Sequence, residues 1–197
     1  MEMNQKRHLD LGCGAKPRNP YQCDIVAGVD LYRASDLPAE VTFKLANLSI
    51  DAIPFEDNSF DSISAFDVIE HIPRVLQDAN NGTYFPFIKL MDEIFRTLKP
   101  EGKFYALTPA YPSCEAFQDP THVNFITSKT HQYFCGNQPG ARPYGFNGNF
   151  DVIAVKWAHS KNANTADWSI RKTFRSIHKF IFFKKKTHLL WELKAKK

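Results

Sequence analysis

Several features are scarce in this sequence, and each scarcity argues against a class of protein. No apolar run approaches the roughly 20 residues that span a bilayer, and residues 1–7 are too polar for the core of a signal peptide. A cytoplasmic protein is therefore expected. No two cysteines have the Cys-x-x-Cys spacing of a zinc or redox site, so the sequence predicts no metal and no disulfide framework. The cysteines are Cys13, Cys23, Cys114 and Cys135.

Most of the chain also lacks the positive charge that is typical of a nucleic-acid surface. Residues 171–197 hold ten basic residues against one acidic residue, Glu192, and carry a net charge of +9. Since the whole chain carries +4, residues 1–170 carry −5. A mildly acidic body makes nucleic acid an unexpected partner. Length predicts a single domain over residues 1–197, with a core at residues 7–158 and the last strand carried by the basic segment 171–197.

What the sequence does contain, near its start, is a glycine turn between two apolar runs. The first run leads into Gly12-Cys13-Gly14, and the second ends at Asp30, sixteen residues after Gly14. Glycine permits backbone angles that a Cβ forbids, and it lets a ligand lie against the main chain. An acidic residue at the end of the next strand can accept both hydroxyls of a ribose. The pattern predicts a nucleoside cofactor, and the alternative is a glycine turn that binds nothing.

The residues after the turn indicate which cofactor fits. Pro17 stands where a dinucleotide fingerprint has its third glycine. Pro17 and Pro20 disfavour a helix directly after the turn, and a pyrophosphate needs the free amides at the start of such a helix. NAD and FAD are therefore disfavoured. S-adenosylmethionine (SAM) carries no phosphate and needs only the turn and the carboxylate.

Five stretches, ordered along roughly residues 7–110, resemble the class I SAM-dependent methyltransferases, and most of all their small type 11 branch. They are LDLGCG at 9–14, GVDL at 28–31, IPFEDNSFD at 53–61, VIEHI at 68–72 and EIFRTLKPEGK at 93–103. The resemblance implies an α/β fold: a Rossmann-like, doubly wound, mostly parallel seven-stranded sheet with an antiparallel edge strand. It also implies an enzyme that uses SAM and releases S-adenosylhomocysteine.

Periodicity alone favours the same architecture, because strands that alternate with helices predict a parallel sheet. Strands are expected at residues 6–11, 25–31, 41–46, 60–66, 103–108, 150–157 and 188–194. Helices are expected at residues 85–98 and 127–134, whereas residues 12–24 are expected to form a loop. The resemblance implies that the last two strands form an antiparallel hairpin at one edge.

Ligands of such sheets bind outside the carboxyl ends of the strands, where the expected cofactor contacts lie. The glycines of the turn would approach the methionine part of SAM, and Asp30 would bind its ribose. The resemblance implies that Asn47 lies near the adenine amino group, that Leu48 forms a wall for the adenine ring, and that Phe66 offers a backbone contact. The full expected set is Asp10, Gly12, Cys13, Gly14, Asp30, Leu31, Asn47, Leu48 and Phe66.

Two histidines are candidates for the base that would take a proton from the acceptor. His122 follows Asp119 by three residues across a proline-containing turn, so Asp119 could orient the imidazole. The alternative is that both residues only brace the loop by hydrogen bonds. His71 follows Glu70 in the VIEHI motif, and the resemblance places it beside the methyl-donor end of SAM. Its alternative role is to pack at the start of a helix.

The expected acceptor is a hydroxyl of a small molecule, because the DPTH run at 119–122 is similar to members among sugar and surface-polysaccharide methyltransferases. The alternatives are an N-methyltransferase acting on RNA or protein, and a non-catalytic partner subunit with the same fold. Residues 174–182 have helical spacing of apolar residues among many basic ones. They predict either a helix packed on the sheet or a peripheral contact with the inner membrane surface.

Overall fold

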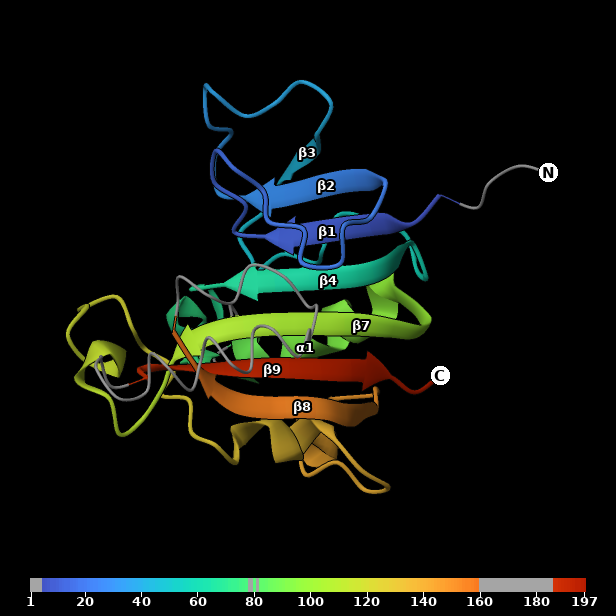
Figure 1. Ribbon diagram of the computed structural model, residues 1–197. Coiled ribbons are helices and arrows are strands. Elements are labelled where there is room, and N and C mark those ends of the chain that lie inside the picture. Colours follow the sequence, from blue (N-terminus) through green and yellow to red (C-terminus); the bar gives the residue numbers. More distant parts are fainter. Residues whose placement is uncertain (1–4, 78–79, 81, 160–185) are drawn as a thin grey trace, which may run out of the picture.

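The computed structural model describes residues 5–77, 80, 82–159 and 186–197, and these residues are organised around one seven-stranded sheet (Figure 1). The strand order is β3-β2-β1-β4-β7-β9-β8. The strands are β1 (Arg7–Leu11), β2 (Ile25–Asp30), β3 (Thr42–Leu45), β4 (Phe60–Phe66), β7 (Leu98–Pro109), β8 (Phe150–Ala158) and β9 (His188–Ala195). The predicted Rossmann-like sheet, mostly parallel with one antiparallel strand, is confirmed.

The antiparallel strand is β9, which pairs with β7 on one side and with β8 on the other. Strand β8 is therefore the outermost one, and β9 lies one place inside the edge. The predicted antiparallel pairing of the last two strands is confirmed. The basic segment contributes β9 to the sheet, whereas the expected amphipathic stretch at 174–182 lies outside the described residues. Among the residues that the structure describes, no helix is long and apolar enough to cross a membrane.

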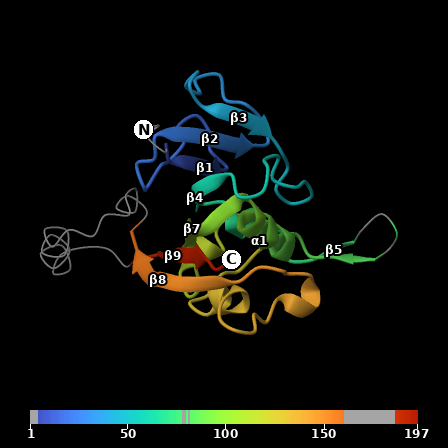
Figure 2. The same ribbon diagram turned by 90° about the vertical axis from the view of Figure 1, so that its right-hand side faces the viewer.

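The helix α1 (Pro86–Thr97) packs on one face of the sheet (Figure 2). Proline suits its first turn, where the missing N–H would have no helical partner. Its apolar side chains recur at helical spacing and are buried against the sheet; they are Phe87, Leu90, Met91 and Ile94. The smaller elements are the hairpin β5 (Leu76–Gln77) and β6 (Thr83–Tyr84) and the 3₁₀ turns η1 (Ile69–His71), η2 (Cys114–Ala116), η3 (Thr130–Phe134) and η4 (Arg142–Tyr144).

The opposite face of β1, β4 and β7 is covered by residues 12–24, which form turns and loop as expected. Tyr21 packs there against the buried ring of Tyr105, and its hydroxyl donates to Glu192 at 2.8 Å. The same face buries polar side chains of β1 and β4, whereas the face under α1 is apolar. A proline-containing loop over buried polar side chains therefore occupies the place where doubly wound sheets commonly carry a helix.

Two sequence expectations about element bounds are wrong. Strand β7 begins at Leu98 rather than at residue 103, because Leu98 already pairs with Phe60 and Pro100 lies at the irregularity that follows. The helix expected at 127–134 is only the 3₁₀ turn η3. There, Thr130 Oγ1 accepts a hydrogen bond from the Thr127 amide at 2.9 Å, and this side-chain bond competes with α-helical bonding.

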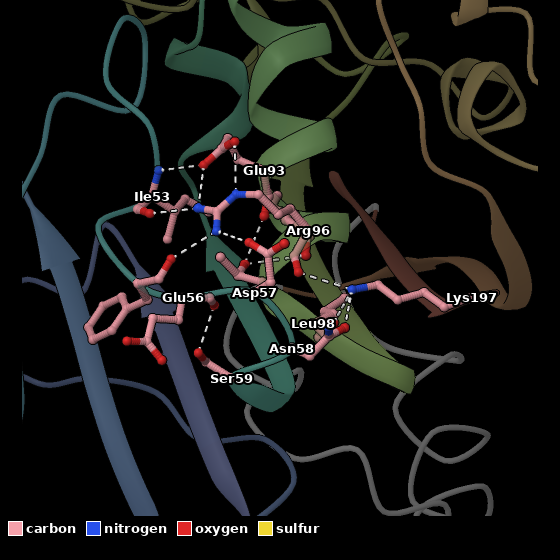
Figure 3. A network of polar contacts seen from close by, with 12 residues as sticks. Ile53, Glu56, Asp57, Asn58, Ser59, Glu93, Arg96, Leu98 and Lys197 are labelled. Carbon is pink, nitrogen blue, oxygen red and sulfur yellow. Dashed lines mark hydrogen bonds and ion pairs between the residues drawn. The ribbon is translucent and has the colours of Figure 1, made fainter.

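A polar cluster around Arg96, at the end of α1, lies at the amino ends of the parallel strands (Figure 3). The Arg96 guanidinium donates to the buried carboxylate of Glu93, to Asp57, and to the carbonyls of Ile53 and Phe55, at 2.6–3.1 Å. Two of the motif stretches, 53–61 and 93–103, meet in this cluster. The cluster joins the loop before β4 to α1, at the end of the sheet opposite the carboxyl ends of the parallel strands.

Candidate functional site

The carboxyl ends of β1, β2, β4 and β7 meet at one edge of the sheet (Figure 1). The glycine turn follows β1, Asp30 ends β2, Phe66 ends β4, and Thr108 lies near the end of β7. These residues are far apart in the chain, and parallel pairing with this register brings them together. The structure thus brings these residues of the candidate site together outside the carboxyl ends of the strands, where ligands of such sheets bind.

The glycine turn has the backbone that its composition predicts. Gly12 has φ +63° and Gly14 has φ +52°, a region that glycine adopts without strain. The amides of Gly12 and Cys13 donate to the Val29 carbonyl at 2.8 and 3.2 Å, which ties the turn to β2. A Cβ on Gly12 would lie 2.4 Å from Val68 Cγ2, whereas one on Gly14 would point into open space. The turn thus packs against the segment after β4 and leaves room above Gly14 for a ligand.

Asp30 is held in an orientation that suits a ribose. Its Oδ2 accepts the Gly14 amide at 2.9 Å, and its Oδ1 accepts the Leu31 amide at 2.7 Å. Each carboxylate oxygen keeps a second lone pair for a ligand hydroxyl, and the Leu31 side chain is exposed beside it. The open cradle at Gly14 and the oriented carboxylate together fit a nucleoside such as that of SAM.

The residues expected at the adenine lie where β3 ends. The Asn47 Oδ1 accepts the Ser49 amide at 3.1 Å, and the Asn47 amide donates to Asp51 at 2.8 Å. This turn leaves the side-chain NH₂ of Asn47 as its remaining donor. Leu48 is almost entirely buried and belongs to the apolar core. Its chief role in this structure is to anchor the turn that presents Asn47.

Three further residues of the expected set, Asp10, Cys13 and Phe66, are buried at the ends of β1 and β4. Asp10 is only 1% exposed, and its carboxylate accepts the Ser64 hydroxyl at 2.5 Å and the Arg18 amide at 2.8 Å. Burial raises the pKa of Asp10 to about 7, against the opposing effect of these hydrogen bonds. The Phe66 ring is buried beneath the Arg18 guanidinium, 4.7 Å from it. The Cys13 thiol packs tightly on Gly28, and burial raises its pKa to about 11.

A second group of polar residues lies next to the glycine turn. Val68, whose side chain lies beside Gly12, leads directly into η1 and thereby connects the two groups. The backbone of η1 binds the loop at 119–126 through several hydrogen bonds. The Glu70 carbonyl accepts the amides of Val123 and Asn124, both at 2.9 Å, and the Asn124 side chain donates to the Ile69 carbonyl at 2.9 Å. These bonds dock a distant loop against the VIEHI motif. They place His122 beside His71.

The side chains of these two segments converge. The His71 and His122 rings lie edge to face, with centroids 4.8 Å apart. The Asp119 Oδ2 lies 3.9 Å from His122 Nε2, an ion-pair distance when the imidazole is protonated. Thr121 links both sides, since its hydroxyl donates to Asp119 at 2.6 Å and lies 3.0 Å from His71 Nδ1. The hydrogen bonds from Thr121 hold the pKa of Asp119 below its ordinary value.

Sequence reasoning missed the part that Glu70 plays in this group, because it named Glu70 only as the residue before His71. The side chain is buried, and its Oε2 accepts the Thr108 hydroxyl at 2.9 Å. Burial raises the pKa of Glu70 to about 8. Asp67 was missed as well: its Oδ1 lies 3.2 Å from Nε2 of His188, at the start of β9. The only sequence signal for either was membership of the stretch around VIEHI.

Comparisons with known proteins agree with this geometry. The model of a family described as a methyltransferase domain matches residues 3–138. Among curated protein sequences, no significant match was found. Similar solved structures include one from the complex of the Haloferax volcanii Trm112 methyltransferase activator with a methyltransferase. That structure is 15% identical, has a TM-score of 0.58, and the match covers 100% of this chain and 86% of the other.

Two further structures are similar at the level of the fold. A SAM-dependent methyltransferase from Mesorhizobium loti is 15% identical, with a TM-score of 0.56, and the match covers 98% of this chain and 93% of that one. The phosphoethanolamine N-methyltransferase 2 of Haemonchus contortus, solved with SAM, is 19% identical with a TM-score of 0.53, and the match covers 98% of this chain and 49% of that one. With the family model matching more than half of the chain, the protein belongs to the methyltransferase-domain family and is a class I SAM-dependent methyltransferase.

Proposed function

We propose that this enzyme transfers the methyl group of SAM to a hydroxyl of a small molecule, and that the acceptor is a sugar or a surface glycan. The observation that carries the proposal is the docking of the loop at 119–126 on η1. It brings His71, His122 and Asp119 together beside the glycine turn. A pair of imidazoles with an adjacent carboxylate suits removal of a proton from a hydroxyl as it is methylated.

When bound, SAM would supply an electrophilic methyl group on its sulfonium sulfur. The acceptor oxygen would bond to the methyl carbon as the carbon–sulfur bond breaks, and S-adenosylhomocysteine would leave. Gly12, Gly14 and Asp30 hold the cofactor, with Asn47 at its adenine end, and Asp10 supports the turn from beneath. The hydroxyl proton passes to His122. The Asp119 carboxylate, 3.9 Å from His122 Nε2, stabilises the imidazolium that forms. His71 lines the same space.

Three exposed aromatic rings, on the segment after β7 and on the docked loop, support an acceptor with a flat apolar face. Tyr111, Phe117 and Phe125 are 57%, 51% and 42% exposed. The centroids of Phe117 and Phe125 are 4.9 Å apart, and Tyr111 meets Phe117 edge to face. Exposed large aromatics that gather next to polar catalytic groups are typical of binding sites. A sugar ring presents C–H groups on one face and hydroxyls at its rim, so it suits both surfaces.

Binding of the cofactor is tested by calorimetric titration with SAM and S-adenosylhomocysteine, with NADH as a negative ligand. Asp30→Ala should weaken SAM binding at least about 10-fold, since a hydrogen bond to a charged group contributes roughly 1.5–3 kcal/mol. The matched control is Asp24→Ala at the opposite end of the β2 region, where the carboxylate accepts the Lys6 amide at 2.8 Å. Equal SAM affinity in the two variants, or no SAM binding by the folded wild type, would contradict the cofactor site.

The acceptor is then sought among sugars, glycans, amines and RNA by following S-adenosylhomocysteine release. With a hydroxyl acceptor, His122→Ala should lower turnover by roughly 10²–10⁴-fold and leave SAM affinity unchanged. Asp119→Asn should cause a smaller loss. Unchanged turnover in His122→Ala would remove it from the reaction. Turnover on amines or RNA alone would favour N-methylation, and turnover that appears only with a partner protein would favour the partner-subunit alternative.

A further inference from the structure

We propose that Glu70, His71 and His122 form a binding site for a first-row divalent transition-metal ion such as Mn²⁺, Co²⁺ or Zn²⁺. Each of the three side chains offers one ligand atom, and these atoms all lie within 4.8 Å of one another. A set of two imidazoles and one carboxylate favours such ions over Mg²⁺ and Ca²⁺, which prefer oxygen ligands. The spacing of the cysteines predicted no metal. The site was missed because its members come from η1 and from the distant loop at 119–126.

Two of the three side chains present buried polar atoms that lack a partner. Within the described part of the chain, Glu70 Oε1 and His122 Nδ1 have no hydrogen bond, and both atoms are shielded from solvent. Glu70 is 1% exposed, and the His122 side chain is 9% exposed. Buried polar atoms are nearly always paired, so two orphaned acceptors in one cluster call for an explanation. A cation bound between them would satisfy both.

The outer polar contacts of the cluster resemble the arrangement found around metal-binding histidines. Such a histidine usually binds the ion through one ring nitrogen and holds a carboxylate or carbonyl with the other. His122 Nε2 faces Asp119 at 3.9 Å, which leaves the orphaned Nδ1 for the ion. His71 Nδ1 lies 3.0 Å from the Thr121 hydroxyl and 3.3 Å from its carbonyl, which leaves Nε2. Glu70 Oε2 is held by Thr108, which leaves Oε1.

The separation of the donor atoms suits an ion after a small closure. Bonds of about 2.0–2.2 Å hold neighbouring ligand atoms roughly 3–3.5 Å apart, so each donor would move inward by roughly 1 Å or less from the present limit of 4.8 Å. Side-chain rotation can supply this movement, because the backbones of η1 and the docked loop are already joined by hydrogen bonds. The two histidines are partly exposed, which gives an ion a route from solvent.

Three protein ligands leave open positions, as in catalytic metal sites rather than structural ones. This role rests on the proposed function: the ion would face the acceptor and lower the pKa of its hydroxyl. His122 would then hold the ion, and the hydroxyl proton would pass to water at the site rather than to His122. The occupancy of the site itself does not depend on the acceptor, so it can be tested without one.

The test is titration of chelator-treated, full-length protein with Co²⁺, followed by its visible absorption, in the absence of SAM and acceptor. The wild type should bind one equivalent. Glu70→Gln, which keeps the shape and can still accept from Thr108, should bind at least 100-fold more weakly, and so should His122→Ala. Asp119→Asn removes only the charge that faces His122 Nε2 and should cost about 10–100-fold. His159→Ala, which changes a histidine outside the cluster, should bind like the wild type.

Circular dichroism and SAM affinity of each variant show whether it has folded. The proposal is overturned if the wild type binds no stoichiometric Co²⁺, or if Glu70→Gln and His122→Ala bind it as tightly as His159→Ala. A wild type that binds SAM but not Co²⁺ overturns the ion site and leaves the proposed methyl transfer standing. A wild type that binds Co²⁺ but not SAM supports the ion site and overturns the proposed function.

Discussion

His8 and Asp10 on β1 belong to a buried chain of hydrogen bonds beneath the glycine turn. The Ser64 hydroxyl donates to Asp10, and His8 Nε2 lies 2.8 Å from the same hydroxyl. His8 Nδ1 lies 2.7 Å from the Ser62 hydroxyl. While Asp10 is ionised, Ser64 can accept only from an Nε2–H of His8, so Ser62 must donate to Nδ1. Burial lowers the pKa of His8 to about 4, and the ring is therefore neutral at neutral pH.

Ionisation of Asp10 should make the stability of the protein depend on pH. Its pKa rises from 3.8 in the unfolded chain to about 7 in the fold because of burial. Between these values the folded protein binds more protons than the unfolded chain, so the Asp10 contribution to the unfolding free energy falls as pH rises. Asp10→Asn mimics the neutral acid, since its NH₂ can donate to Ser64 while Ser64 donates to His8.

Asp10→Asn should therefore have nearly the unfolding free energy of the wild type at pH 4 and exceed it by a few kcal/mol at pH 8. The upper bound is on the order of 4 kcal/mol, at about 1.4 kcal/mol per pKa unit. Urea unfolding of both proteins across this range measures the difference, and contributions from Glu70 and His8 cancel because both proteins keep them. A difference that stays constant with pH would show that Asp10 is ionised in the fold throughout.

At the scale of elements, α1 is attached to the sheet both by its apolar face and by the cluster around Arg96. The guanidinium bridges α1 to the loop before β4, and Lys197 donates to Asn58 and to the carbonyls of Arg96 and Leu98 nearby (Figure 3). Arginine suits this place because its planar fork can serve several acceptors at once. The motif stretches 53–61 and 93–103 thus support the fold at the edge remote from the candidate site.

Arg96→Ala should lower the unfolding free energy by about 3–5 kcal/mol, because it removes a main partner of the buried Glu93 carboxylate. Glu93 is only 5% exposed at its side chain, and the Ile53 and Phe55 carbonyls also lose their donor. The control is Lys99→Ala, which breaks the partly exposed pair with Asp61 and should cost about 1 kcal/mol or less. Urea unfolding measures both. Losses of equal size would contradict a structural role specific to Arg96.

At the scale of the whole molecule, the two edges of the sheet have different tasks. The glycine turn, Asp30 and the group around His122 lie at the carboxyl ends of the parallel strands, whereas the Arg96 cluster lies at their amino ends. Strand β9 is antiparallel to β7, so it starts at the carboxyl ends of the parallel strands and finishes at their amino ends. Its first residue, His188, reaches Asp67 at the carboxyl edge, and Lys197, just beyond its end, reaches the amino edge.

Much of the fold and part of the candidate site could be predicted from the sequence. Strand positions did, because alternation and turn residues are local; β4 occupies the predicted residues 60–66. The glycine turn and Asp30 were also predictable, since both are read within one strand-turn-strand unit. The starts of β7 and η3 were not, because side-chain bonds and pairing with β4 outweighed local preference.

Only the tertiary structure decided which residues meet across long stretches of chain. The sequence identified His71 and His122 separately and could not show that the loop at 119–126 docks on η1 through the Glu70 carbonyl. Nor could it show that Glu70 points into that cluster or that Asp10 lies beneath the turn. Such facts depend on packing between distant segments, for which local periodicity carries no signal. Local chemistry therefore determined the strands and the glycine turn with Asp30, and packing decided which distant side chains join Glu70, His71 and His122 in one cluster.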